Sequence, residues 1–293
     1  MRRISRHSGD NPAFKPYKEN GIESLRLRHF LPGRTMTHPF FKALIASLLF
    51  LVIACPAHAQ TQPPRFKAVA FDYFVIFDPN SVVAEVEKVF PGNGMAITKA
   101  WRAKQFEYGF LRSITNNHKD FFKVTEDALT YTLESVQLEA TPAQKESMLN
   151  AYLALKPWPD AVEGLKTLKA AGIKIITIAN FSPAMLKSNA DKAGITDLFD
   201  DLLSTQVNRT YKPDADAYAL GLSSLGLKKE EIVFAAFGGW DAYGAKMFGY
   251  PTYWVNRFNL PAEKMDVQAD ATSADFQGLL NFVLGMERTA PGK

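Results

Sequence analysis

The sequence predicts an α/β fold, with a Rossmann-like doubly wound parallel sheet as the core and a helical cap inserted after the first strand. From Phe66 onward, short apolar runs typical of buried strands alternate with helical patterns of ten or more residues. Strands separated by helices of that length pair in parallel through right-handed crossovers. Only the stretch after the first strand departs from this alternation, because it shows helical patterns alone until about Leu155.

The elements divide the chain into a core of residues 66–78 and 156–285 and a cap of residues 79–155. The first strand is Lys67–Phe71, and it ends at Asp72. The helical patterns of the cap are Ser81–Phe90, a segment around Trp101–Leu111, Phe121–Glu134 and Pro142–Leu155. The later core elements are the helix Ala161–Ala171, the strand Ile173–Ile178, the helix Pro183–Ala193, the segment Phe199–Ser204, the helix Asp214–Leu225, the strand Ile232–Ala236, the helix Trp240–Met247 and the strand Thr252–Asn256.

A secretory signal peptide is predicted at residues 36–59, and residues 1–35 are interpreted as an upstream extension. The apolar run Leu44–Ile53 follows Lys42 and precedes Ala57-His58-Ala59. A basic flank, a short apolar run and an A-x-A site are typical of a cleaved signal peptide. Two alternatives stay open, an uncleaved anchor and a lipoprotein modified at Cys55.

Charge and residue counts exclude several function classes. The whole chain has 34 basic and 30 acidic residues; nine and three of them lie in residues 1–59, which leaves 25 and 27, a net charge of −2. That body is not basic enough for nucleic acid. The one cysteine, Cys55, lies in the leader, and His118 is the one histidine outside it. These counts argue against a His-rich metal site, a thiol nucleophile and a Ser-His-Asp triad.

Polar side chains stand where predicted strands or turns end. They are Asp72, Asn180, Lys212 and Asp241. In open α/β sheets, sites form at the carboxyl ends of the strands. Three of them also have an ordinary structural explanation, since Asp241 could cap its helix, Lys212 could belong to a loop and Asn180 could form a turn. Together the four residues favour a site at this edge.

Several blocks of the sequence are distinctive in combination. They are FDYFVIFDPNSVV, AWRAKQFEYGFLRS, ANFSPAML, YKPDADAY, GGWDAYGAKMFGYP and WVNR. With these blocks, the chain from Phe66 to about Val283 resembles the type II L-2-haloacid dehalogenases of the haloacid dehalogenase superfamily. The resemblance implies a metal-independent hydrolase without cofactor, acting on a small 2-haloacid or related acid through an aspartyl ester on Asp72.

The resemblance also implies roles for individual residues. It suggests Asp72 as nucleophile, Arg102 as halide and leaving-group clamp, Asn180 as halide or substrate contact, Lys212 as charge partner of Asp72, Tyr218 as a substrate-pocket residue, and Asp241 as part of the network that positions water and lysine. The expected partners are the small-molecule substrate and, as a candidate, a second copy of the chain in a homodimer. No nucleic acid is expected, and no membrane after signal cleavage.

The chemistry is consistent with these roles. An aspartate can displace halide only if it is ionised, and a lysine nearby favours the charged form. An arginine in a closed site can stabilise the departing halide. A phosphatase of the superfamily would carry a second acid two residues after the nucleophile, where this chain has Phe74. Phosphatase activity is therefore disfavoured.

Three stretches depart from the family pattern. The stretch from Asp72 to Asp78 is one residue shorter and lacks the Gly and Thr of Asp-x-Tyr-Gly-Thr-Leu-Phe-Asp. Ala179-Asn180-Phe181 replaces Ser-Asn-Gly, and Ala236-Phe237-Gly238 replaces Ser-Ser-Asn. Each lost donor could cost about 2–4 kcal/mol of transition-state stabilisation. Two alternatives thus remain open, a catalytically impaired binding protein and a hydrolase of shifted substrate such as a phosphatase.

The leader generates the first prediction. Export to the periplasm or the medium is expected to be followed by cleavage after Ala59, because the A-x-A site follows the apolar run directly. N-terminal sequencing of the exported protein should therefore start at Gln60. Full-length protein that stays in the cytosol would contradict this interpretation.

Overall fold

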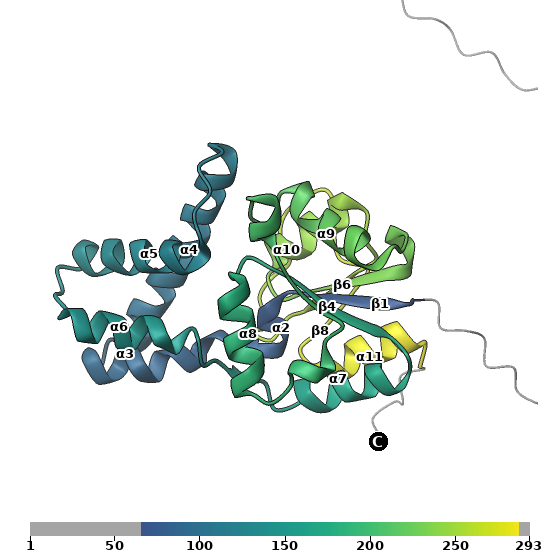
Figure 1. Cartoon of the computed structure of the whole chain (residues 1–293), viewed down its shortest axis with the longest axis horizontal. Helices are drawn as coiled ribbons and strands as arrows, with labels where there is room; N and C mark the ends of the chain where they lie inside the picture. Colours follow the sequence, from purple (N-terminus) through teal and green to yellow (C-terminus); the bar gives the residue numbers. More distant parts are fainter. Residues whose placement is uncertain (1–65, 287–293) are drawn as a thin grey trace, which may run out of the picture. The chain divides into compact units, whose positions relative to one another are not determined.

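The structure is a computed structural model, and it describes residues 66–286. The predictions of an extension at residues 1–35 and a signal peptide at residues 36–59 lie outside the described residues. Within the described range, the chain forms one parallel sheet flanked by helices and a group of helices beside it (Figure 1).

The sheet has six strands in the order β5-β4-β1-β6-β7-β8, and all neighbours pair in parallel. The strands are β1 (Ala68–Phe71), β4 (Lys174–Ala179), β5 (Asp201–Ser204), β6 (Ile232–Ala236), β7 (Thr252–Val255) and β8 (Ala271–Ser273). The first strand, β1, lies in the middle of the sheet, with β4 and β5 on one side of it and β6, β7 and β8 on the other. This arrangement confirms the predicted α/β fold class.

Helices cover both faces of the sheet (Figure 1). They are α7 (Ala161–Ala170), α8 (Pro183–Lys192) and α11 (Phe276–Leu284) on one face, and α9 (Ala215–Leu225) and α10 (Gly239–Phe248) on the other. Alternate residues of β1 enter the two layers, because successive strand side chains point to opposite faces. Val69 and Phe71 pack into the first core, and Ala68 and Ala70 into the second. All four are fully buried, which explains the continuous apolar run in the sequence.

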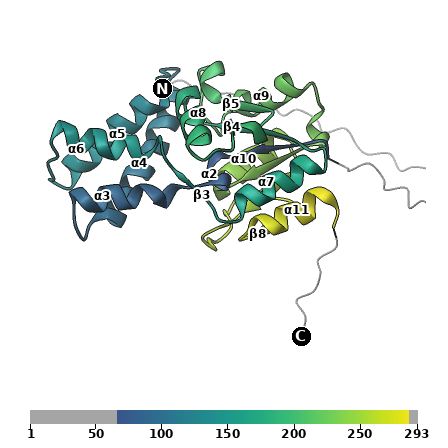
Figure 2. The same ribbon diagram turned by 60° about the horizontal axis from the view of Figure 1, so that its bottom comes forward.

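The segment expected to be the cap forms a group of helices beside the sheet (Figure 2). They are α3 (Val83–Val89), α4 (Gly94–Ile114), α5 (Phe121–Ser135) and α6 (Pro142–Ala151). The chain leaves the core through β2 (Phe77–Asp78) and returns through β3 (Lys156–Pro157), and the two short strands pair antiparallel. Short 3-10 turns complete the structure at η2 (Pro79–Val82), η3 (Thr196–Leu198), η4 (Thr205–Asn208) and η5 (Lys229–Glu231).

Helix α6 ends at Ala151, four residues before the predicted end. The cause is a side chain from α8. The Asn189 amide oxygen accepts a hydrogen bond from the backbone N–H of Leu155 at 2.6 Å, and its Nδ2 donates to the carbonyl of Tyr152 at 2.9 Å. Backbone groups that would have continued the helix are satisfied by this buried asparagine instead.

Besides the two-residue strands β2 and β3 and the 3-10 turns, three elements were not predicted. Helix α2 (Tyr73–Ile76) is a single turn within an apolar run, and β8 is a three-residue edge strand without an apolar pattern. Helix α11 could have been predicted from its end residues, because Asp275 caps its start and Gly285 ends it with φ 66°. Its buried residues also follow helical spacing; they are Phe276, Leu279, Leu280 and Val283.

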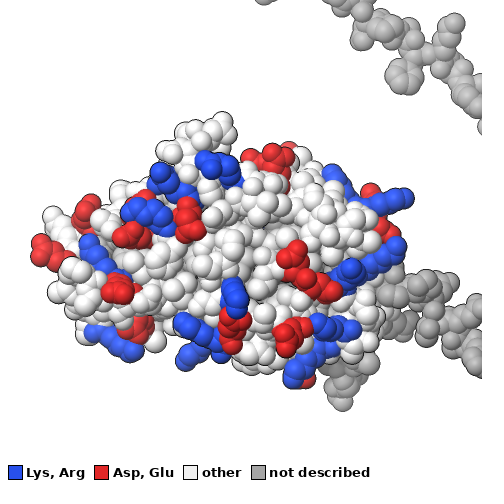
Figure 3. Space-filling model, in the orientation of Figure 1, with Lys and Arg blue, Asp and Glu red and all other residues white. Residues whose placement is uncertain are grey.

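Basic and acidic side chains are interspersed on the face seen in Figure 3. No helix among residues 66–286 combines the length and apolar character needed to cross a membrane.

Candidate active site

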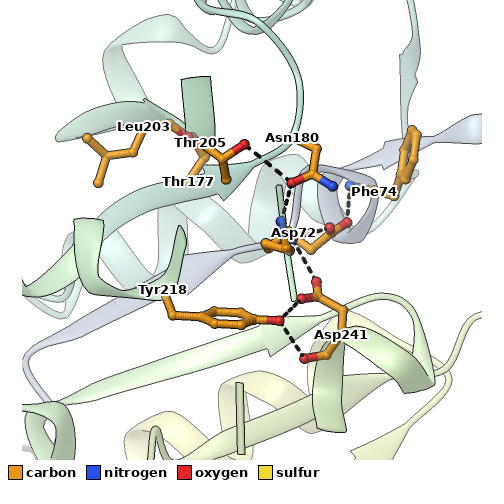
Figure 4. Close-up of polar contacts among 9 residues, drawn as sticks. Asp72, Phe74, Thr177, Asn180, Leu203, Thr205, Tyr218 and Asp241 are labelled. Atoms are coloured by element: carbon orange, nitrogen blue, oxygen red, sulfur yellow. Dashed lines mark hydrogen bonds and ion pairs between the residues drawn. The ribbon is translucent and has the colours of Figure 1, made fainter. Parts of the chain in front are cut away.

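Four of the predicted site residues converge at the carboxyl edge of the sheet (Figure 4). Asp72 follows β1, and its N–H extends the pairing with β6 by donating to the carbonyl of Ala235 at 2.9 Å. Asn180 follows β4, and Asp241 lies in the first turn of α10, after β6. Lys212 lies in the loop between η4 and α9.

A buried lysine joins the two carboxylates. Lys212 Nζ lies 2.6 Å from Asp72 Oδ2 and 2.7 Å from Asp241 Oδ2. The side chains of Lys212 and Asp241 are 1% and 0% exposed, and that of Asp72 is 12% exposed. One ammonium thus compensates two carboxylates, and Asp72 is the member with remaining access to a ligand.

Burial changes the protonation of this cluster. Burial raises the pKa of Asp241 to about 7, the negative charge of Asp72 acts in the same direction, and Lys212 opposes the rise. Burial alone would lower the pKa of Lys212, but the two carboxylates hold it above its ordinary value. Lys212 therefore stays charged at neutral pH, and Asp241 is the group that can take up a proton there.

Tyr218 contacts the carboxylate oxygen of Asp241 that Lys212 does not contact. It is fully buried, and its hydroxyl donates to Asp241 Oδ1 at 2.7 Å. Gly244 permits this approach, because a Cβ at that position would lie 2.5 Å from the Tyr218 oxygen. Tyr218 therefore reaches the site through Asp241, whereas the resemblance had suggested a residue of the substrate pocket.

Asn180 fixes the lysine loop. Its Oδ1 accepts hydrogen bonds from the backbone N–H of Lys212 at 2.8 Å and from Thr205 Oγ1 at 3.4 Å (Figure 4). The adjacent turn is capped separately by Ser182. Within residues 66–286 the Asn180 Nδ2 group has no acceptor and remains available to a ligand.

The turn after the nucleophile candidate is held in place. Asp72 caps α2, since its Oδ1 accepts from the N–H of Phe74 at 2.8 Å. The indole N–H of Trp158 donates to the Phe74 carbonyl at 2.9 Å, and Arg257 Nη2 donates to the Val75 carbonyl at 3.3 Å.

Sequence reasoning did not assign these two positioning residues. Arg257 belongs to the WVNR block, and Trp158 lies just before the first core helix of the return from residues 79–155. Arg257 is anchored by Asp160 at 2.6 Å, and its guanidinium lies 5.0 Å from the Trp158 ring. Both residues are distant from Asp72 in sequence, so local patterns could not indicate their contacts.

Three phenylalanines cluster at this edge, and two of them, Phe181 and Phe237, lie where the family pattern has Gly and Ser. Phe74 packs against Phe181 at 5.5 Å and against Phe237 at 5.8 Å between ring centroids. All three are buried, as are Ala179 and Ala236 at the strand ends. This edge of the sheet is therefore lined by buried apolar side chains.

Arg102 lies over this aromatic group. Its guanidinium carbon is 5.4 Å from the Phe74 ring centre and 5.5 Å from that of Phe237. Burial lowers the pKa of Arg102, and the negative charge of Asp72 opposes that shift. Within the described part of the chain, no carboxylate or carbonyl pairs with Arg102. A guanidinium stays charged at neutral pH, so Arg102 is a cation available to an anion near Asp72.

A cavity of 540 Å³ opens beside Arg102. Its wall is mostly apolar and comes from η2, α4 and the loop after β7. The lining residues include Thr98, Arg102, Ala103, Phe106, Phe258 and Leu260. Asp72, Lys212 and Asp241 do not line the cavity, and Arg102 is shared between its wall and the aromatic group that contains Phe74.

Among residues 66–286, no group of three His, Cys, Asp or Glu side chains is arranged to hold a metal ion. Independence from metal remains a prediction.

The fold and the site define a doubly wound α/β protein in which a carboxylate at the end of a central strand pairs with a buried lysine. A sequence profile of haloacid dehalogenase-like hydrolases matches residues 35–249. The chain is 38% identical over 228 residues to an (S)-2-haloacid dehalogenase of Pseudomonas sp. (strain YL), across 78% of this chain and 97% of that protein. The chain belongs to the haloacid dehalogenase-like hydrolase family.

Solved structures agree with this assignment. The L-2-haloacid dehalogenase of Xanthobacter autotrophicus with chloropropionic acid covalently bound has a TM-score of 0.71 at 34% identity, covering 76% of this chain and 100% of that one. A second L-2-haloacid dehalogenase has a TM-score of 0.73 at 35% identity, covering 74% and 98%.

Asp241 provides a stability test with a defined sign. Its pKa is raised from 3.8 to about 7 in the folded protein, so the folded state binds this proton more tightly than the unfolded state. The free energy of unfolding should therefore fall as pH rises from about 4 to about 7. Asp241→Asn cannot titrate. Urea unfolding at pH 5 and 7.5 should show the parent losing stability relative to this variant, and a pH-independent difference would contradict the assignment.

Proposed function

We propose that this protein hydrolyses a small 2-haloacid, or a related acid, through an ester on Asp72. The proposal rests on the sheet edge, where Asp72 is paired with Lys212 and the guanidinium of Arg102 lies over the ring of Phe74, two residues after Asp72. The relatives named (S)-2-haloacid dehalogenases support the reaction class and favour the (S) enantiomer as substrate.

In the first step, a carboxylate oxygen of Asp72 attacks C2 of the acid. The new C–O bond forms as the carbon–halogen bond breaks, and halide leaves with the bonding electron pair. Negative charge moves from Asp72 to the halide, so positive charge is needed both near the Asp72 carboxylate and near the departing halide. Lys212 is fixed at the carboxylate, and Arg102 and the free Nδ2 of Asn180 are available to the halide.

In the second step, water attacks the carbonyl carbon of the Asp72 ester. The acyl C–O bond breaks, the 2-hydroxy acid leaves with its C2 configuration inverted by the first displacement, and one proton is released. Asp241 forms an ion pair with Lys212. Its pKa near 7 suits a group that accepts this proton. Tyr218 orients Asp241 for this task.

The helices of residues 79–155 would act as the cap, because α4 brings Arg102 to the sheet edge. Cleavage of the signal peptide at residues 36–59 would make the enzyme periplasmic or secreted.

An alternative is a catalytically impaired binding protein. The buried apolar residues Ala179 and Ala236, and the absence of a side chain at Gly238, favour it, because donors for the substrate carboxylate and the hydrolytic water are missing there. The intact cluster of Asp72, Lys212 and Asp241 argues for catalysis. Halide release from a panel of 2-haloacids decides between the two.

The nucleophile can be tested directly by isotope labelling. Because water enters at the carbonyl of Asp72, a single turnover in heavy-oxygen water should label the Asp72 carboxylate before it labels the product, as measured by peptide mass spectrometry. Asp72→Asn should reduce halide release by at least about a thousandfold, since a neutral amide is a poor nucleophile.

The matched control for this variant is Asp197→Asn, an exposed position away from the site, which should keep parental activity. An Asp72→Asn protein that is folded and releases halide at the parental rate would exclude the covalent mechanism.

Metal dependence separates dehalogenation from phosphoryl transfer. The position two residues after Asp72 is Phe74, whose ring packs against Phe181 and Phe237, so the second carboxylate of a phosphatase is missing. Halide release should therefore be unchanged after EDTA treatment. Loss of activity that magnesium restores, together with phosphate release from phosphate esters, would instead support the phosphatase alternative.

A further inference from the structure

The cavity beside Arg102 is larger than an acid of two or three carbons needs. Its 540 Å³ lies in the range of pockets that enclose drug-sized ligands. Helix α4 supplies one wall with Ala103 and Phe106, and the loop after β7 supplies the facing wall with Phe258 and Leu260. Phe258 and Leu260 are 39% and 55% exposed. Large apolar side chains thus face an open space in the protein.

One cation of the cavity wall has no ion pair. Arg102 makes no salt bridge within residues 66–286, and its guanidinium lies over the rings of Phe74 and Phe237. The hydroxyl of Thr98, four residues earlier on α4, has no hydrogen-bond partner, but it is buried and is not exposed to the cavity. Arg102 is therefore the group that can bind the charged head of an acid in this wall.

Arg102 connects the cavity to the reaction site. The negative charge of Asp72 acts on Arg102, and the Phe74 ring that lies against Arg102 belongs to the turn capped by Asp72. A ligand whose polar head is bound by Arg102 can therefore present its neighbouring carbon to Asp72, while the rest of the molecule lies among apolar side chains.

We propose that this cavity binds the apolar body of the substrate, so that the preferred acids carry an alkyl chain or a ring beyond the third carbon. The inference rests on the proposed dehalogenation and names its substrate class, the medium-chain 2-halo acids. Arg102 lies at the polar end of the acid, where the halide leaves, and Ala103, Phe106 and Leu260 contact the chain.

Binding of unreactive acids tests the cavity without any chemistry. Calorimetric titration of the mature protein with propionate, hexanoate and octanoate should show affinity rising with chain length. Full burial of a methylene is worth about a fourfold gain in affinity. Octanoate should therefore bind at least about tenfold more tightly than propionate, even if only part of the chain is buried. Equal affinities for the three acids would overturn the proposal.

Substitutions inside and outside the cavity wall test whether the chain of the acid binds in the cavity. Ala103→Phe places a ring in the cavity and should bring the octanoate-to-propionate affinity ratio close to one. Ala100→Phe places the same ring at an exposed position of α4 outside the cavity wall, and it should keep the parental ratio. A parental ratio in Ala103→Phe would contradict the assignment.

Dehalogenation of 2-bromopropionate and 2-bromooctanoate distinguishes the two proposals. The value of kcat/KM should be higher for the longer acid, and Ala103→Phe should abolish that preference. Bromide release from the short acid without any gain from the chain would refute the cavity assignment and leave dehalogenation standing. Length-dependent binding without bromide release from any acid would support the cavity and refute dehalogenation.

Discussion

A buried ammonium held between two carboxylates is the interaction on which the rest of the site depends. Lys212 lies within 2.7 Å of both Asp72 and Asp241, and the three residues come from three separate elements. Removing one member of such a buried group leaves an uncompensated charge, which typically costs about 3–5 kcal/mol. The fold must therefore bring the ends of β1 and β6 and the η4–α9 loop together before any chemistry is available at Asp72.

Packing around the cluster fixes each member. Asn180 holds the backbone of Lys212, Tyr218 holds Asp241, and the absence of a side chain at Gly244 lets Tyr218 approach. Charged groups held in fixed positions need little reorganisation when charge moves during a reaction. The apolar replacements at this edge act in the other direction, because they remove donors and leave Arg102 as the cation that faces an incoming anion.

Much of the fold could be predicted from the sequence, because burial on both sheet faces gives continuous apolar runs and helices give their own period. The segments that were not predicted are those whose secondary structure depends on contacts with other residues. Helix α6 ends at Ala151 because Asn189 takes the following backbone groups. Helix α2 replaces further strand because Asp72 caps it. Local periodicity contains no information about such contacts.

The apolar runs of the sequence show which polar residues follow the strands, and the resemblance of its motifs suggests their roles. Which of these residues contact one another depends on the folded arrangement of the elements. In the fold, Lys212 pairs with two carboxylates, and Tyr218 donates a hydrogen bond to Asp241. Arg102 and Thr98 line a cavity whose facing wall comes from residues far along the chain. The physical reason is that periodicity reports burial along one element, whereas a site is made by contacts between elements remote in sequence.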